Sequence, residues 1–213
     1  MNVLLFGASG AIGCAIAGEL VRRGHAVTGV TRTGTPLDDL PVEVIIGDAA
    51  DPDSVARLAA GRDAVVSAVG PRRDPAEDAE QSLLGAARGL VAGLRRAGVR
   101  RLVVVGGAGS LEVSPGERLV DTPGFPRAWR PAALAHADAL DVFAAADDLD
   151  WTYISPAAQI GPGERTGKFR VGGDQLLRDE AGHSLIAIPD FAIAVADAIE
   201  SGGPARQRIS VAY

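Results

Sequence analysis

Two patterns of apolar and polar residues alternate along the chain. Short runs of continuously apolar residues have the length and composition of buried strands. Between them lie longer segments in which apolar residues recur every three to four positions, which is the period of an amphipathic helix. The predicted strands are 2–6, 26–31, 42–46, 63–69, 101–105, 151–154, 184–188 and 207–212. The predicted helices are 11–23, 52–60, 77–97, 131–147 and 190–200.

The ends of these helices carry the expected boundary residues. Gly24, Gly61 and Gly98 follow the first three predicted helices, and glycine is favoured just past a helix C-terminus. Pro52 lies at the start of the second helix, where a missing N–H costs nothing. The two stretches 106–130 and 155–174 show neither period and are predicted to be irregular; the first is long enough to expect a functional role.

The alternation of strand and helix predicts the fold class. Strands that are apolar throughout are typical of parallel sheets buried on both faces. Right-handed crossovers then give an α/β fold, a doubly wound parallel sheet with a small C-terminal substrate lobe. Because no repeat or linker-like tract interrupts the pattern, we expect residues 1–213 to form one domain, with 155–189 contributing the lobe.

Composition and charge narrow the classes of function. The chain has 213 residues, a net charge of −6 and no basic surface signature, which argues against a nucleic-acid partner. No apolar run approaches the ~18 residues that a membrane span needs. The single cysteine, Cys14, excludes an intrachain disulfide and is interpreted as a small packing residue. We therefore expect a cytoplasmic monomer or homodimer that acts on a small molecule, and we assign no metal site.

The stretch LLFGASGAIG, residues 4–13, passes from the first predicted strand through a glycine loop into the first predicted helix. In that setting Gly7 permits a tight turn, Gly10 lets a pyrophosphate approach the backbone, and Gly13 packs the helix on the strand. The helix N-terminus offers N–H groups to the phosphates, and Ser9 can add a hydroxyl. The alternative is a purely structural turn. The predicted phosphate-binding residues are Gly7, Ser9, Gly10, Ala11, Ile12 and Gly13.

The end of the second predicted strand bears on the choice of cofactor. An NAD-binding protein usually has Asp or Glu there to hold the ribose hydroxyls, whereas this strand ends in Thr31 and Arg32. A guanidinium can bind a 2′-phosphate that a carboxylate would repel. The sequence therefore favours NADP(H) over NAD(H), the alternative being a solvated Arg32 beside an unselective pocket.

Motifs along nearly the whole chain resemble a known family. The G-x-x-G-x-x-G spacing and the segments GVTR, GDAAD, DAVVSAVG, RLVVVGGAGS, DWTYISPA and IGPGERTGKF are similar to atypical short-chain dehydrogenase/reductases. Within these the chain resembles NmrA-like proteins and the biliverdin reductase B/flavin reductase group, above all small bacterial NADH-flavin reductases. The resemblance implies a Rossmann-like fold, an adenine contact from Asp48 and a ribose contact near Gly70. It also places the nicotinamide near the residues after the fifth and sixth strands, including Ser110, Pro156 and Gln159.

The chain lacks the Tyr-x-x-x-Lys pair of many of these reductases. Its tyrosines are Tyr153 and Tyr213, and no tyrosine stands four positions before its one lysine, Lys168. Ketone reduction needs a positioned acid, whereas a flavin or quinone spreads the incoming charge and can take its proton from water. The catalytic candidates are then Ser110 and His136, with Gly107 as an alternative match to the family's serine. A helix histidine bonded to a carbonyl is the competing interpretation of His136.

These observations leave three functions open. The first is an NAD(P)H-dependent reductase of a flavin, quinone or similar conjugated molecule, with FMN or FAD as a substrate. Arg72 and Arg73, after the fourth strand, are candidates to attract an anionic substrate of this kind. The second is an NmrA-like redox sensor that binds NADP(H) without turnover. The third is an NADP-dependent epimerase or isomerase, which the missing tyrosine disfavours.

Overall fold

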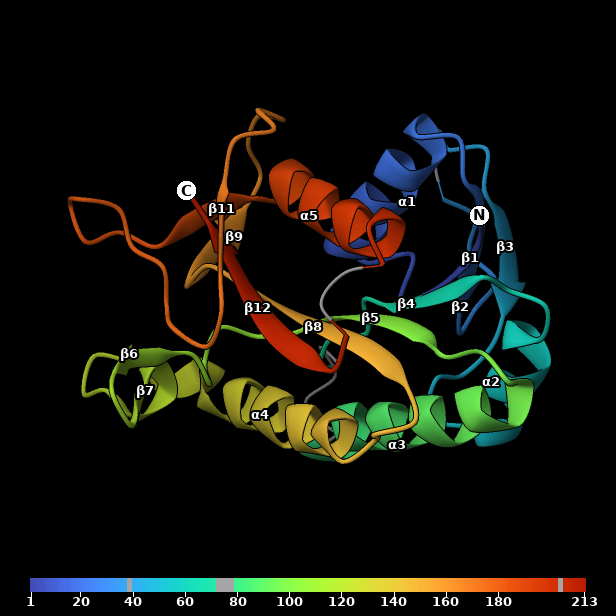
Figure 1. Cartoon of the computed structure of the whole chain (residues 1–213), viewed down its shortest axis with the longest axis horizontal. Coiled ribbons are helices and arrows are strands. Elements are labelled where there is room, and N and C mark those ends of the chain that lie inside the picture. The colour runs from blue at the N-terminus through green and yellow to red at the C-terminus, as the bar shows by residue number, and fades with distance from the viewer. Residues whose placement is uncertain (38–39, 72–78, 203–204) are drawn as a thin grey trace.

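A central sheet with helices on both faces organises the protein (Figure 1). The computed structural model describes residues 1–37, 40–71, 79–202 and 205–213. Within these residues the sheet has eight strands in the order β10-β12-β8-β5-β4-β1-β2-β3. The strands are β1 (Asn2–Phe6), β2 (Ala26–Thr31), β3 (Glu43–Ile46), β4 (Ala64–Ser67), β5 (Arg101–Val105), β8 (Asp150–Pro156), β10 (Arg170–Gly172) and β12 (Gln207–Ala212).

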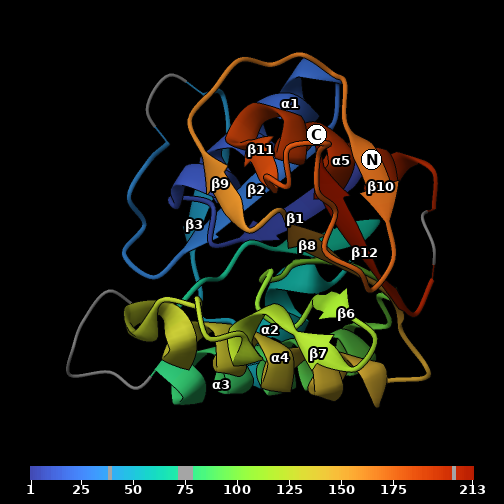
Figure 2. The same ribbon diagram turned by 90° about the vertical axis from the view of Figure 1, so that its left-hand side faces the viewer.

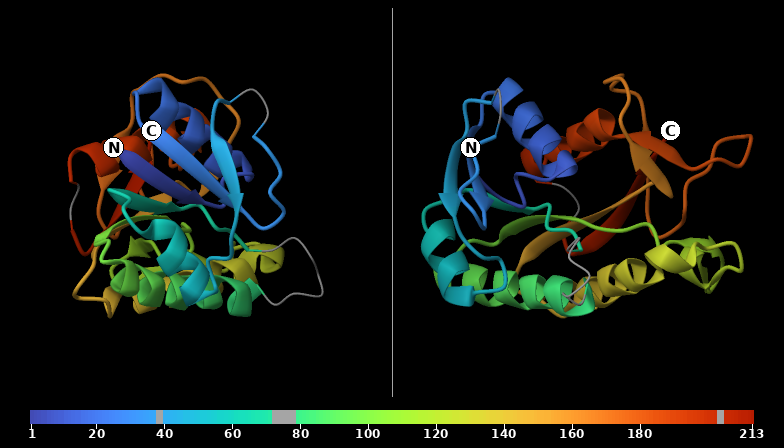
Figure 3. Two further views of the ribbon diagram at one scale, coloured as in Figure 1. Left: turned by 90° about the vertical axis from the view of Figure 1, so that its right-hand side faces the viewer. Right: turned by 180° about the vertical axis from the view of Figure 1, so that it is seen from behind.

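Two layers of helices cover the sheet, as Figures 1 and 3 show from several sides. One face carries α1 (Ala11–Arg22) and α5 (Ile188–Glu200). The other carries α2 (Pro52–Ala59), α3 (Ala79–Ala97) and α4 (Arg130–Ala144). These layers confirm the Rossmann-like, doubly wound α/β fold.

The core divides into two halves because side chains alternate across each strand. Along β1, Val3 and Leu5 pack toward α1 and α5, whereas Leu4 and Phe6 pack toward α2, α3 and α4. All four side chains are almost completely buried. This two-sided burial explains why the strand is apolar at each position from Val3 to Phe6 rather than at alternate ones.

The prediction of irregular structure in 106–130 and 155–174 was wrong in part. The first stretch contains a hairpin, β6 (Glu112–Ser114) and β7 (Glu117–Arg118), and 3₁₀ turns at Leu119–Asp121 and Arg127–Trp129. The second contains β10, which is antiparallel to β12, and β9 (Gln159–Gly161), which pairs with β11 (Leu185–Ala187). These strands are too short to show a period, and the partners of β9 and β10 lie far away in the sequence.

The parallel strands of the sheet all end at one edge, which faces the viewer in Figure 2. The hairpin β6–β7 and the small β9–β11 sheet lie at this same side of the molecule. Ligands of open α/β sheets bind outside the carboxyl ends of the strands, so this edge is where a site is expected. In the described part of the chain, no helix is long and apolar enough to cross a membrane.

Candidate functional site

The glycine loop between β1 and α1 is held by close backbone packing. Gly7 has a φ of +77°, and a Cβ there would lie 2.5 Å from the carbonyl oxygen of Ala68. A Cβ on Gly13 would lie only 2.1 Å from the carbonyl oxygen of Gly7. The Gly7 amide donates to the Val30 carbonyl at 3.2 Å, which ties the loop to β2. The fold itself therefore requires glycine at positions 7 and 13.

Gly10 differs from these two glycines. A Cβ there would meet its nearest neighbour, the Gly7 carbonyl oxygen, at an ordinary 3.5 Å, and the backbone has a φ of −74°. Protein packing does not demand glycine at this position, but Gly10 lines a cleft into which a side chain would project. It is also the N-cap of α1, where no side chain caps the first turn and no acidic residue occupies it. Such a helix start is suited to bind an anion.

The cleft extends along the ends of β1 to β4 and has a volume of about 240 Å³. It brings together six of the eleven residues predicted to bind the cofactor: Gly7, Ser9, Gly10, Arg32, Asp48 and Gly70. Its remaining lining residues are Phe6, Val30, Thr31, Gly47, Ala49, Ala50, Ala68, Val69, Ser82 and Ala86. Ala11, Ile12 and Gly13 form the first turn of α1 directly behind Gly10.

Asp48 and Arg32 lie at the end of the cleft formed by β2 and β3. One carboxylate oxygen of Asp48 accepts a hydrogen bond from the Ala50 amide at 2.9 Å, and the Asp48 amide donates to Ser54 Oγ at 3.2 Å. These bonds fix the turn into α2. The hydroxyl of Thr31 accepts a hydrogen bond from the Gly34 amide at 2.9 Å, so it shapes the turn after β2. Arg32 follows Thr31 directly and is exposed, so it is the charged residue nearest the end of β2 within the cleft.

His136, on α4, lies beside a buried tyrosine. The Tyr153 hydroxyl donates to the His136 carbonyl oxygen at 2.8 Å and lies 3.4 Å from His136 Nδ1. It also accepts a hydrogen bond from the Gly107 amide. The ring of His136 borders a small cavity that shares Val69 and Ala86 with the cleft. The candidate catalytic histidine is thus a neighbour of the cleft rather than part of its lining.

Burial sets the protonation of this pair. Desolvation lowers the pKa of His136 to about 4 and raises the pKa of Tyr153 above its usual range. Gly106 makes room for the tyrosine, because a Cβ there would lie 1.9 Å from its ring. Gly107 does the same for His136, whose ring would lie 3.0 Å from an added Cβ. At neutral pH the imidazole is uncharged and can form hydrogen bonds but cannot act as an imidazolium acid.

The other catalytic candidate, Ser110, is held away from the cleft. Its buried Oγ accepts a hydrogen bond from Arg208 at 2.9 Å. Arg208 also pairs with Asp174 at 2.7 Å, so Ser110 belongs to a network that ties the loop after β5 to β12. It does not line the cleft with Gly10.

Pro156 and Gln159 are not among the residues that line the cleft either. Pro156 is the buried last residue of β8. Gln159 begins β9 and lines a separate open cavity of about 500 Å³, together with Leu185 and Tyr213. Arg72 and Arg73 lie outside the described residues.

The motif GERTGKF forms a strap across α1 and α5, and two buried carboxylates hold it. Arg165 donates twice to Glu19 of α1, each time at 3.0 Å. The Thr166 and Gly167 amides each donate at 2.8 Å to Asp190 of α5. Figure 2 shows this segment passing over the two helices. This motif, one of those that carry the family resemblance, thus holds α1 and α5 together and does not line the cleft with Gly10.

Hydrogen bonds keep both carboxylates ionised. The bond from Arg22, followed by those from Arg165 and Arg23, holds the pKa of Glu19 far below its usual range against the cost of burial. Burial raises the pKa of Asp190, but hydrogen bonds led by that from Thr166 outweigh it and lower the pKa overall. Neither Glu19 nor Asp190 was predicted from the sequence as a functional or anchoring residue. The sequence feature that could have revealed them is an acidic residue among the apolar residues of a predicted helix, as in GCAIAGEL for Glu19 and IPDFAIAV for Asp190.

Comparisons with known proteins agree with this geometry. A family model described as NAD(P)H-binding matches residues 7–201. A "Putative exported protein" from Burkholderia pseudomallei is 49% identical, with a TM-score of 0.90 and full coverage of both chains. A "putative epimerase" from Bacteroides thetaiotaomicron is 33% identical, with a TM-score of 0.90 over 100% of this chain and 96% of the other. A "putative NADH-flavin reductase" from Streptococcus pneumoniae is 34% identical, with a TM-score of 0.86 over 100% of this chain and 99% of the other.

The matched family segment contains every residue of the cleft except Phe6. It includes Gly10 at the uncapped start of α1 as well as Asp48 and Arg32 at the other end of the cleft. The resemblance inferred from the sequence is therefore confirmed, and the cofactor is a nicotinamide dinucleotide. This chain belongs to the NAD(P)H-binding family of Rossmann-fold, oxidoreductase-like proteins.

Proposed function

We propose that the protein is an NADP(H)-dependent oxidoreductase that passes hydride to a flavin, a quinone or a similar conjugated acceptor. The observation that carries the proposal is the cleft itself. It joins an uncapped helix start at Gly10 to a β2 end that offers Arg32 instead of a carboxylate. The cleft's other limit, at Val69 and Ala86, adjoins the cavity of His136.

The residues of the cleft fit an extended dinucleotide. Amides at the start of α1 would hold the pyrophosphate, because they are uncapped and Gly10 leaves room for the phosphate oxygens. Asp48 would accept a hydrogen bond from the adenine, and Gly70 would border a ribose. Arg32 would pair with a 2′-phosphate, which favours NADP(H). When bound, the cofactor supplies the hydride, and the protein orients it.

The surroundings of His136 favour a conjugated acceptor. The imidazole is neutral at pH 7, and the completely buried Tyr153 hydroxyl already bonds Gly107 and His136. Lys168 lies exposed in the strap, away from the cleft. Reduction of a ketone would need an acid here, whereas a flavin or quinone delocalises the added charge and can be protonated by water. His136 would then orient the acceptor by a hydrogen bond.

An epimerase is a second candidate because the Bacteroides thetaiotaomicron neighbour carries that description at 33% identity. That chemistry needs a base beside the nicotinamide to remove a substrate proton. The buried Tyr153, whose pKa is raised, is poorly placed for this role. We therefore rank epimerisation below reduction.

Oxidation of NADPH and of NADH by FMN, riboflavin and menadione tests the proposal. We expect steady turnover with at least one acceptor and a preference for NADPH. Gly10→Glu serves as the control, because its carboxylate would enter the cleft and repel the pyrophosphate while leaving the packing of positions 7 and 13 intact. Tight binding of NADPH without oxidation by any acceptor would favour a redox sensor instead.

A further inference from the structure

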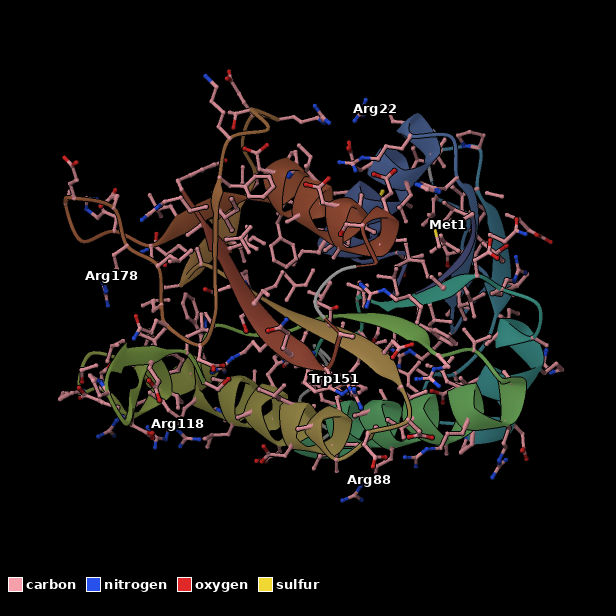
Figure 4. All side chains as sticks on the ribbon, viewed as in Figure 1. Met1, Arg22, Arg88, Arg118, Trp151 and Arg178 are labelled. Atoms are coloured by element: carbon pink, nitrogen blue, oxygen red, sulfur yellow. The ribbon has the colours of Figure 1, made fainter. Side chains whose placement is uncertain are left out.

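Helix α3 lies very close to the turn that joins β3 to α2. Gly85, Gly89 and Gly93 recur at every fourth position of α3, so they lie on one side of the helix. Arg88 is exposed, and Figure 4 shows it pointing away from the sheet, which marks the outer side. Gly89 and Gly93 are buried on the inner side, against the turn and α2. The lack of side chains at these positions therefore lets the two elements approach each other.

The closest backbone contact of α3 with this turn is at Gly89. A Cβ there would lie 2.3 Å from the carbonyl oxygen of Ala49 and 2.7 Å from the carbonyl carbon of Ala50. These atoms belong to the backbone and cannot rotate aside as the end of a long side chain can, so even a methyl group would force the turn and the helix apart. Alanine is otherwise the better helix former, so the close approach is the physical reason for glycine at this position.

Both surfaces that meet at Gly89 also line the cleft. Ala49 and Ala50 line it from the turn, and Ala86 lines it from α3. Asp48 is tied to this turn, because its carboxylate accepts a hydrogen bond from the Ala50 amide at 2.9 Å. Whether the turn or the helix moved, separating them would shift the Asp48 carboxylate relative to α3. The spacing at Gly89 thus sets the shape of this end of the cleft.

We propose that Gly89 is a positioning residue for the adenine half of the cofactor. It holds the turn of Ala49 and Ala50 against α3 and so fixes the position of the Asp48 carboxylate in the cleft. The inference rests on the proposed function, which assigns the adenine contact to Asp48. A displacement of about 1 Å takes a hydrogen bond beyond its working distance, so a single methyl group at position 89 is enough to lose that contact.

Dissociation constants measured by calorimetry test the proposal. The ligands are NADPH and adenosine 2′,5′-bisphosphate, which carries only the adenine half. We expect Gly89→Ala to raise both Kd values about tenfold, which corresponds to the loss of one hydrogen bond to a charged group.

Gly93→Ala is the matched control on the same helix. A Cβ at Gly93 would lie 2.4 Å from the Cβ of Val55, which does not line the cleft. The control should therefore lower the urea midpoint of unfolding, as Gly89→Ala does, but leave both Kd values unchanged. Unchanged Kd values in folded Gly89→Ala, an equal rise in the two variants, or a rise for NADPH alone would overturn the proposal.

A second pair of variants keeps the proposal testable if Gly89→Ala does not fold. Gly85 is half-buried, and a Cβ there would lie at an ordinary 3.5 Å from the Cβ of Ala50. Gly85→Ala should therefore bind both ligands like wild type, whereas Gly85→Val, which extends beyond that Cβ, should push on Ala50 and raise both Kd values. In that case wild-type Kd values in Gly85→Val would overturn the proposal. Because both ligands bind without turnover, these constants decide the inference even where no acceptor oxidises NADPH.

Discussion

The two ends of the sheet's carboxyl edge are built in different ways. At the β1–β2–β3 end, the cleft is lined largely by backbone and small residues, and the packing around Gly10 does not itself require a glycine there. At the β5–β8–β12 end, polar side chains are engaged with one another, as in Ser110 with Arg208 and His136 with Tyr153. The difference indicates that binding of the cofactor depends on local backbone shape. The side proposed for the acceptor, by contrast, is built from long-range contacts that also hold the fold.

Substitution of the glycines has the largest expected effect on stability and is therefore the strongest test of this difference. Gly13→Ala puts a Cβ 2.1 Å from the Gly7 carbonyl oxygen, so we expect the free energy of unfolding to fall by about 3 kcal/mol or more. Gly10→Ala should cost about 1 kcal/mol or less, the usual loss at an N-cap. It should nevertheless weaken NADPH binding, because its methyl group enters the cleft. Urea unfolding and calorimetry measure the two effects, and a similar loss of stability in both variants would refute the distinction.

The strap offers a second test of the same contrast. Asp190 is completely buried and accepts bonds from the Thr166 and Gly167 amides, the Thr166 hydroxyl and the Tyr213 hydroxyl. Asp190→Ala leaves these donors unpaired, and we expect a loss of about 2–3 kcal/mol in unfolding free energy. Thr166→Val, which removes only the hydroxyl, should cost about 1 kcal/mol.

The Kd for NADPH is the discriminating measurement on the folded strap variants. It should remain at the wild-type value in both, since neither residue lines the cleft. A tenfold weaker Kd in folded Asp190→Ala would show that the strap belongs to the cofactor site after all.

The same contrast explains what the sequence could predict. Gly7, Gly10 and Gly13 form a local motif whose setting between a strand and a helix is visible in the sequence. The cleft residues Arg32 and Asp48 lie within two positions of the ends of predicted strands, so their position at the sheet edge needed no tertiary information. The order of strands and helices was therefore enough to predict the position of these cleft residues.

Long-range pairs were beyond such local inference. Arg208 is 98 positions from Ser110, and Arg165 is 146 positions from Glu19. Nothing in a short window shows that a motif such as GERTG will bind a helix near the other end of the chain. The family resemblance includes this motif, but only the structure shows that it anchors the strap instead of lining the cleft with Gly10.

The burial of His136 predicts a pH effect on stability. Its pKa is about 4 in the folded protein and about 6.5 in an unfolded chain, so between these values the unfolded chain binds the proton and the folded protein does not. Stability from this group is complete above pH 6.5 and is lost as the pH falls toward 4. Between pH 7 and pH 5 we expect a loss of about 2 kcal/mol.

Urea unfolding of His136→Asn at the same pH values isolates that contribution. The variant should lack about 2 kcal/mol of the wild-type dependence, because asparagine does not titrate. If the free energy of unfolding depended on pH equally in the two proteins, the protonated ring of His136 would have to be solvated in the folded protein. Such a result would also remove the argument that the imidazole stays neutral beside the acceptor.

The smallest expected effect concerns Arg32, at the end of the sheet edge where the cofactor is proposed to bind. Arg32→Ala removes the cation at the end of β2 without touching the glycine loop, so a bound 2′-phosphate loses a charge-assisted partner. We expect the Kd for NADPH to rise about tenfold, at the lower end of a hydrogen bond to a charged group, while the Kd for NADH stays the same. Arg57→Ala, on the last turn of α2, is the matched control, because it removes an exposed arginine outside the cleft. If Arg32→Ala weakened both dinucleotides equally, Arg32 would act through the electrostatic potential of the whole cleft, and the proposed preference for NADP(H) would lose its support.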